Sequence, residues 1–169
     1  MNARHVQRLA ALALGALLAG CATGLPYGLQ PGASAEEVVQ RLGRPGAEVP
    51  LPGGGRRLEF ASGPFGRTTY MVELDAQGRL LRWENVLDEA HFNDIVAGLT
   101  REQVRERLGP PSVIWGVRYH DQTVWSYRSE GRRCELFHVG ITPQGVVEDT
   151  SYGPDPLCER GGLLHEGLH

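Results

Sequence analysis

One stretch of the sequence decides the fold: Gly98-Leu99-Thr100-Arg101-Glu102-Gln103-Val104-Arg105-Glu106-Arg107-Leu108-Gly109-Pro110-Pro111. A close match to it lies 66 residues earlier, over Gly32–Pro45. In each copy a hydroxyl residue is followed three positions later by Glu or Gln, which is the pattern of a capping box at the start of a helix. These pairs are Ser34 with Glu37, and Thr100 with Gln103. The sequence therefore predicts the same short helix twice.

Both predicted helices have one apolar face and a glycine at the end. The apolar pairs stand four residues apart, as Val38 with Leu42 and Val104 with Leu108, so each pair lies on one side of its helix. Gly43 and Gly109 suit the left-handed conformation that ends many helices. Because helices this short are marginal in water, each must pack against another element.

That element is predicted to be a sheet, and it also repeats. Apolar residues alternate with other residues in two segments, at Tyr70, Val72 and Leu74 and at Phe137, Val139 and Ile141. Period-two alternation indicates a strand with one buried face. Further strands are expected over residues 79–86 and 146–152, although their pattern leaves the inward side open. We therefore expect an α+β fold of two tandem small units, each with short helices on a three- to four-stranded antiparallel sheet.

The boundaries follow from these patterns. We expect a lipoprotein signal peptide at 1–20, a tether at 21–31, the first repeat at 32–87, the second repeat at 88–158 and a flexible tail at 159–169. The second repeat also gains a candidate helix between Asp88 and Val96.

The N-terminus carries an export signal. Basic residues precede an uncharged apolar run from Leu9 to Leu18, which is too short to span a bilayer as a permanent helix. The following Leu18-Ala19-Gly20-Cys21 resembles the lipobox of bacterial lipoproteins, which implies cleavage before Cys21 and attachment of diacylglycerol and palmitate to it. Residue 22 is Ala rather than the Asp of inner-membrane retention signals, which implies a lipid-anchored location on the periplasmic face of the outer membrane.

Composition and motifs point away from several functions. Without Arg4 and Arg8, 15 Arg remain against 20 acidic residues, so no basic field for nucleic acid is expected. The sequence contains no zinc-protease helix, nucleophile elbow or phosphate loop. We therefore expect no catalytic residues, cofactor, metal or small-molecule substrate, and we interpret the polar residues of 88–94, including His91, as one side of a helix.

Two cysteines remain beyond the anchor, Cys134 and Cys158. In an oxidising compartment such a pair normally forms a disulfide. The hairpin closed at residues 142–145 places Cys134 roughly opposite Gly153, and the following segment can return Cys158 to bridging distance. The alternative is a reactive Cys134 thiol whose pKa is lowered by Arg132 and Arg133.

The strand pattern also predicts where a partner binds. One face of each sheet is expected to be open to water, and on it the alternation places Met71 in the first unit and Leu136 and His138 in the second. Exposed apolar residues that cluster indicate an interaction site. We therefore expect an envelope protein to bind at Met71, Leu136 and His138.

The motif Ile95-x-x-Gly98-Leu99-Thr100-x-x-x-Val104-x-x-x-Leu108-Gly109-x-Pro111, followed by Trp125-x-Tyr127, resembles the BamE (SmpA/OmlA) domain. The first repeat resembles a degenerate second copy that lacks the Trp-x-Tyr. The resemblance implies an outer-membrane lipoprotein that acts as a binding or scaffolding accessory of the β-barrel protein assembly machinery. An alternative is an enzyme inhibitor, because two tandem units resemble the architecture of β-lactamase inhibitory proteins. A third hypothesis, an enzyme, has no motif behind it.

Overall fold

The computed structural model describes residues 28–117 and 121–158, which form two antiparallel four-stranded sheets with a few short helices. The first unit contains α2 (Ala35–Leu42), β1 (Ala47–Pro50), β2 (Arg56–Ala61), β3 (Thr69–Leu74) and β4 (Leu80–Asn85). The second contains α3 (Glu89–Asn93), α4 (Arg101–Leu108), β5 (Val113–Val117), β6 (Gln122–Arg128), β7 (Glu135–Ile141) and β8 (Val147–Pro154). The strand orders are β1-β2-β3-β4 and β5-β6-β7-β8. The predicted α+β class with two small units is confirmed.

The sequence repeat is also a structural repeat. Ser34 accepts a hydrogen bond from the Glu37 amide (3.2 Å), and Thr100 and Gln103 form both bonds of a capping box. The first N–H of each helix then donates to the glycine carbonyl of the turn between the last two strands, at 2.9 Å in α2 and 2.8 Å in α4. Each helix is therefore fixed at its N-terminus to its own sheet.

Bulges explain why the last strand of each sheet was hard to assign. The register shifts between Glu73 and Leu74 in β3, and again between Gly140 and Ile141 in β7. A bulge adds a residue on one strand, and here the extra residue lies on the last strand of each sheet, β4 or β8. The side chains of that strand therefore do not alternate strictly between the two faces. Leu80 consequently lies opposite Leu74 in the core, while Leu81 is 58% exposed.

The core of the first unit lies between α2 and one face of its sheet. Its buried residues are Leu29, Ala35, Val38, Leu58, Phe60, Val72, Leu74 and Leu80. The expected inward face of β3 is thus correct. Leu29, which we assigned to the tether, is fully buried here, so the first unit begins no later than Leu29. The expected signal peptide, the lipidation site at Cys21 and the tail lie outside the described residues.

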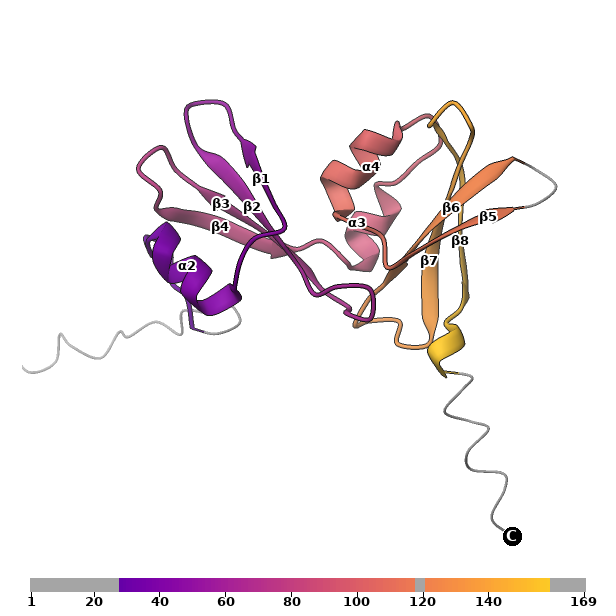
Figure 1. Ribbon diagram of the computed structural model, residues 1–169, viewed down its shortest axis with the longest axis horizontal. Coiled ribbons are helices and arrows are strands. Elements are labelled where there is room, and N and C mark those ends of the chain that lie inside the picture. Colours follow the sequence, from indigo (N-terminus) through magenta and orange to yellow (C-terminus); the bar gives the residue numbers. More distant parts are fainter. Residues whose placement is uncertain (1–27, 118–120, 159–169) are drawn as a thin grey trace, which may run out of the picture.

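The second core is larger and joins the two units. It contains Met71, Val86, Leu87, Phe92, Ile95, Val104, Leu108, Trp125, Tyr127, Phe137, Val139, Ile141 and Val147. Figure 1 shows the resulting layers, with α2 outside the first sheet and α3 and α4 between the two sheets. The predicted exposure of Met71 is wrong, because the second unit covers that face and leaves Met71 4% exposed.

Polar side chains also hold the two units together. The Arg105 guanidinium on α4 pairs with both carboxylate oxygens of Glu59 on β2, and Glu59 is itself buried. Gly109 ends α4 with a φ of 77° and approaches Thr69, so that a Cβ at this position would lie 2.8 Å from the Thr69 methyl group. Glycine is therefore required both by the backbone conformation and by the approach of the first sheet.

Within the part of the chain that the structure describes, no helix has the length and apolar character needed to cross a membrane.

We predict that Met71→Ala destabilises the whole protein. Removing a buried methionine side chain costs about 2–5 kcal/mol, and here the cavity would form between the units. Urea unfolding measures the loss. Leu81→Ala, on the exposed side of β4, is the control and should change stability by less than about 0.5 kcal/mol. Equal effects of the two substitutions would show that the face of Met71 is not covered.

Candidate protein-binding groove

The second sheet has one face that α3 and α4 do not cover, and a groove of about 530 Å³ lies on it. We call this face the open face. The groove is lined by Phe65, Val113, Trp115, Arg128, Leu136, His138, Pro154, Pro156 and Leu157. Several of its apolar side chains are exposed, with Phe65 at 74%, Trp115 at 45% and Leu157 at 40%. The groove therefore offers apolar surface that no described residue covers.

The residues predicted to bind a partner here are placed differently from what we expected. Leu136 and His138 do lie on the open face, as the alternation indicated. However, the predicted exposure of Leu136 is wrong, since it is 5% exposed and forms part of the groove floor. Phe65, Pro156 and Leu157, from segments outside the strands, line the same groove, and strand alternation could not predict their presence. His138 is half-buried.

Three side chains from neighbouring strands form a connected layer on the open face. The Trp115 indole N–H donates to the Ser126 hydroxyl oxygen at 3.0 Å. The same hydroxyl lies 2.8 Å from His138 Nδ1, and the two rings meet edge to face with centroids 5.9 Å apart. Ser126 is fully buried beneath them. The hydroxyl therefore fixes the positions of the two rings.

Burial favours the neutral form of His138 in this layer. Its partial burial lowers its pKa from the ordinary value, because burial disfavours the charged imidazolium. A neutral ring can accept a hydrogen bond from the Ser126 hydroxyl at Nδ1, which leaves the Ser126 oxygen free to accept a hydrogen bond from Trp115. Gly153 makes room for the ring, since a Cβ there would lie 2.6 Å from His138 Nε2.

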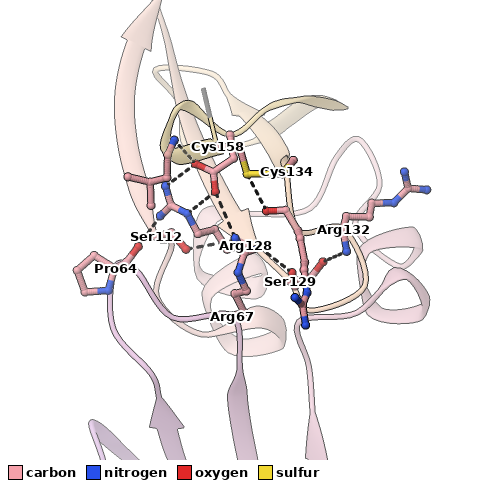
Figure 2. Close-up of polar contacts among 11 residues, drawn as sticks. Pro64, Arg67, Ser112, Arg128, Ser129, Arg132, Cys134 and Cys158 are labelled. Carbon is pink, nitrogen blue, oxygen red and sulfur yellow. Dashed lines mark hydrogen bonds and ion pairs between the residues drawn. A yellow bond between two sulfur atoms is a disulfide. The ribbon is translucent and has the colours of Figure 1, made fainter. Parts of the chain in front are cut away.

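One wall of the groove is held by a buried ion pair (Figure 2). Arg128 on β6 donates to both carboxylate oxygens of Asp155, from Nε at 2.7 Å and from Nη2 at 2.9 Å. Both side chains are almost completely buried. Asp155 also accepts the amide of Leu157 at 3.1 Å, which fixes the turn that carries this groove residue. Two-point pairing of this kind restricts orientation as well as distance.

The same arginine fixes the loop of the first unit that carries Phe65. Arg128 donates through Nη1 to the carbonyl of Pro64. Arg67, at the other end of this loop, donates to the Ser129 carbonyl at 3.1 Å and lies 3.9 Å from Asp155. Both projecting apolar residues, Phe65 and Leu157, are thus positioned by one buried charge cluster.

The predicted disulfide between Cys134 and Cys158 is present, with Cα atoms 5.6 Å apart. It closes the segment that follows β8 onto the start of β7. The expected register was off by two residues, because Cys134 lies beside Asp155, whose amide donates to the Cys134 carbonyl at 2.9 Å. The bulge at Gly140 accounts for part of this shift. Fewer residues than expected therefore separate Cys158 from the residue that lies beside Cys134.

The polar residues around α3 form ion pairs. His91 lies 2.7 Å from Asp88 and 3.5 Å from Glu84 of the first unit. Burial alone would lower the pKa of His91, but the bonds and charges of Asp88 and Glu84 outweigh it and raise the pKa. No group of three or more potential metal ligands occurs among residues 28–117 and 121–158.

Several residues of the groove were missed from the sequence. Phe65 and Leu157 lie in loops that periodicity cannot assign, and the Arg128–Asp155 pair joins residues 27 positions apart. A weak signal existed for Asp155, since it stands between Pro154 and Pro156, where the backbone is restricted. An acidic residue between two prolines has a restricted backbone, which suggests that its carboxylate is held in a fixed position.

We predict that Asp155→Asn destabilises the protein by about 3–5 kcal/mol near pH 7, because it leaves the buried Arg128 cation without its counter-charge. The hydrogen bonds from Arg128 lower the pKa of Asp155. The contribution of this pair is therefore present above the unfolded carboxyl value of about 3.9 and is lost as the pH falls through the lower folded value. Urea unfolding near pH 7 and at progressively lower pH measures both effects.

The control for this prediction is Glu48→Gln, which breaks an exposed pair with Arg56 and should cost at most about 1 kcal/mol. A difference between wild type and Asp155→Asn that stays constant down to the lowest pH would contradict the ion pair.

No protein-family model matches the sequence, and no curated protein matches it. Three solved structures are similar over most of the chain at low identity. A DUF4309 family protein from Bacillus subtilis is 12% identical with a TM-score of 0.30, over 73% of this chain and 79% of that one. A cysteine-rich secretory protein from Staphylococcus aureus is 9% identical with a TM-score of 0.30, over 79% of this chain and 49% of that one. An extracellular protein containing a SCP domain from Bacillus anthracis is 8% identical with a TM-score of 0.29, over 77% of this chain and 46% of that one. The chain spans about half the length of the last two, and likeness at this level carries no functional inference.

Proposed function

We propose that this chain is a non-enzymatic lipoprotein of the outer membrane that binds an envelope protein in the groove on its open face. The observation that carries the proposal is the combination of exposed apolar side chains with rigid walls. Phe65 and Leu157 project into solvent, yet the backbones beside them are fixed by the buried Arg128 and Asp155. Exposed apolar groups on preorganised backbone favour binding, since little ordering cost remains.

The lipobox-like sequence ending at Cys21 supports the membrane location. The described fold begins no later than Leu29, so at most seven residues separate it from Cys21. Even fully extended, seven residues span only about 25 Å. A partner is therefore expected at or near the membrane surface. The resemblance to the BamE domain supports a scaffolding role beside the β-barrel assembly machinery.

The inhibitor-like alternative is less well supported. It would use both sheets to grip one enzyme, which requires an uncovered face on each. In this chain α3 and α4 cover the second face of the first sheet, where Met71 is buried. Only the second sheet retains an open face for a partner among the described residues.

The anchor is tested by Cys21→Ser. If the lipobox functions, wild-type cells labelled with radioactive palmitate should incorporate it into the protein, and the variant should incorporate none and remain uncleaved or soluble. Palmitate labelling that persists in Cys21→Ser would refute lipidation at this residue.

The groove is tested by photocrosslinking in intact cells. A photoreactive residue replaces either Phe65 or Leu157, both of which project from the walls of the groove. Each should give the same crosslinked protein, and Leu136→Glu in the groove floor should abolish it. The matched control is a photoreactive residue at Leu81, which is 58% exposed on the first sheet and should not give that product.

Identical products from Phe65, Leu157 and Leu81, or no product from the two groove positions, would refute the groove as the binding site. Loss of the crosslinked product in Leu136→Glu counts only if the Cys134–Cys158 disulfide and the melting temperature of this variant show that it folds. If it does not, Leu157→Glu serves as the exposed replacement.

A further inference from the structure

The two sheets have four edge strands among the described residues, namely β1, β4, β5 and β8. An edge strand has backbone N–H and C=O groups without strand partners, so it can pair with another chain. Proteins commonly prevent such pairing with charges, prolines or very short strands. The four edges of this chain can therefore be compared with one another.

Three of the edges carry these protective features. β1 has only four residues, includes Glu48 and ends at Pro50. β4 contains Arg82 and Glu84, and β8 contains the adjacent acids of residues 148–149 and ends at Pro154.

The fourth edge, β5, is one residue longer than β1 and differs from the other three edges in its residue types. Its sequence is Val113-Ile114-Trp115-Gly116-Val117, without a charge or a proline. Its large apolar side chains are exposed on both faces of the sheet, with Ile114 at 58% and Trp115 at 45%. Figure 1 shows the β5–β6 hairpin projecting from the body on the side away from the first unit. The edge is thus both unprotected and accessible.

We propose that β5 pairs antiparallel with β5 of a second copy of this chain, which joins two four-stranded sheets into one continuous eight-stranded sheet. An extended strand is the occupant that can satisfy the unpaired backbone groups along an edge. The proposal is independent of the lipid anchor, and it shares Trp115 with the groove.

The sequence of β5 favours a second copy as the occupant. In a register centred on Trp115, the two Trp115 side chains lie opposite each other, and aromatic pairs across strands are stabilising. Ile114 then lies opposite Gly116, so a large side chain meets a residue without one. Because β5 carries no charge, self-pairing brings no like charges together.

The charged β8 edge favours this closed arrangement. Pairing of β5 with β8 of another copy would leave a free β5 at the end and so continue without limit. Glu148 and Asp149 on β8 oppose such pairing with an apolar strand. Pairing of β5 with β5 uses both apolar edges and leaves only protected ones. It also places both open faces on the same side of the joined sheet.

Sedimentation of the full chain, purified in detergent and measured across a concentration series, tests the dimer. The expected result is a protein mass that rises from that of one chain to that of two chains as the protein concentration increases. Ile114→Lys should reduce it to that of one chain, because a charged edge prevents strand addition. The control Leu81→Lys introduces the same charge at equal exposure, 58%, on the β4 edge, and should leave the dimer intact. A wild-type chain that stays monomeric overturns the proposal, as does a doubled mass that Ile114→Lys does not change.

Cysteine crosslinking tests the register. Opposed residues of an antiparallel pair have Cα atoms about 4.5–5.5 Å apart, within the range that a disulfide bridges. Trp115→Cys should therefore form a reducible covalent dimer, whereas Val113→Cys should do so only when mixed with Val117→Cys. Equal crosslinking by Trp115→Cys and the control Leu81→Cys overturns the pairing. Melting temperatures show that each variant folds.

Discussion

The structure depends on the position of α3 and α4, whose apolar side chains pack between two sheets. A short amphipathic helix normally covers one sheet, and α2 does only that. α4 instead places Val104 and Leu108 in a core that also contains Met71 of the first sheet. On its other side Arg105 neutralises the buried Glu59. Because buried carboxylates are costly unless they are paired, this contact also fixes how the two units are arranged.

A second constraint acts beside the groove, where Arg128 is buried with five N–H donors to satisfy. It bonds to Asp155 of the C-terminal segment and to the Pro64 carbonyl of the first unit. The disulfide at Cys158 holds the same segment a few residues later. Apolar packing and buried charge thus connect the units at two separate places.

The repeated local patterns made much of the fold predictable. Caps, terminal glycines and alternating strands depend on residues close in sequence, so the helices at Ser34 and Thr100 and the inward faces of β3 and β7 were predicted correctly. The disulfide could be predicted because two cysteines leave one pairing. The exposure of Met71 and Leu136 was mispredicted for one reason. Alternation tells which face of a sheet a residue occupies, but not whether another part of the chain covers that face.

The groove was the least predictable feature. Its floor could be placed on a strand, but its walls come from loops at Phe65 and Leu157, and these are joined by a charge pair distant in sequence. Such contacts follow from the arrangement of the two units. The local patterns of a sequence do not contain that arrangement.

The sharing of α4 between the sheets has a consequence for synthesis. A chain is made from its N-terminus, and domains that fold independently can do so in that order. Here residues 28–87 are complete before α4 exists, so Met71 and Glu59 have neither their apolar cover nor their counter-ion at that stage. The first repeat resembles an independent domain in sequence, yet its native surface is finished only after Leu108 has been made. The two repeats are therefore expected to reach the native state together, as one cooperative unit.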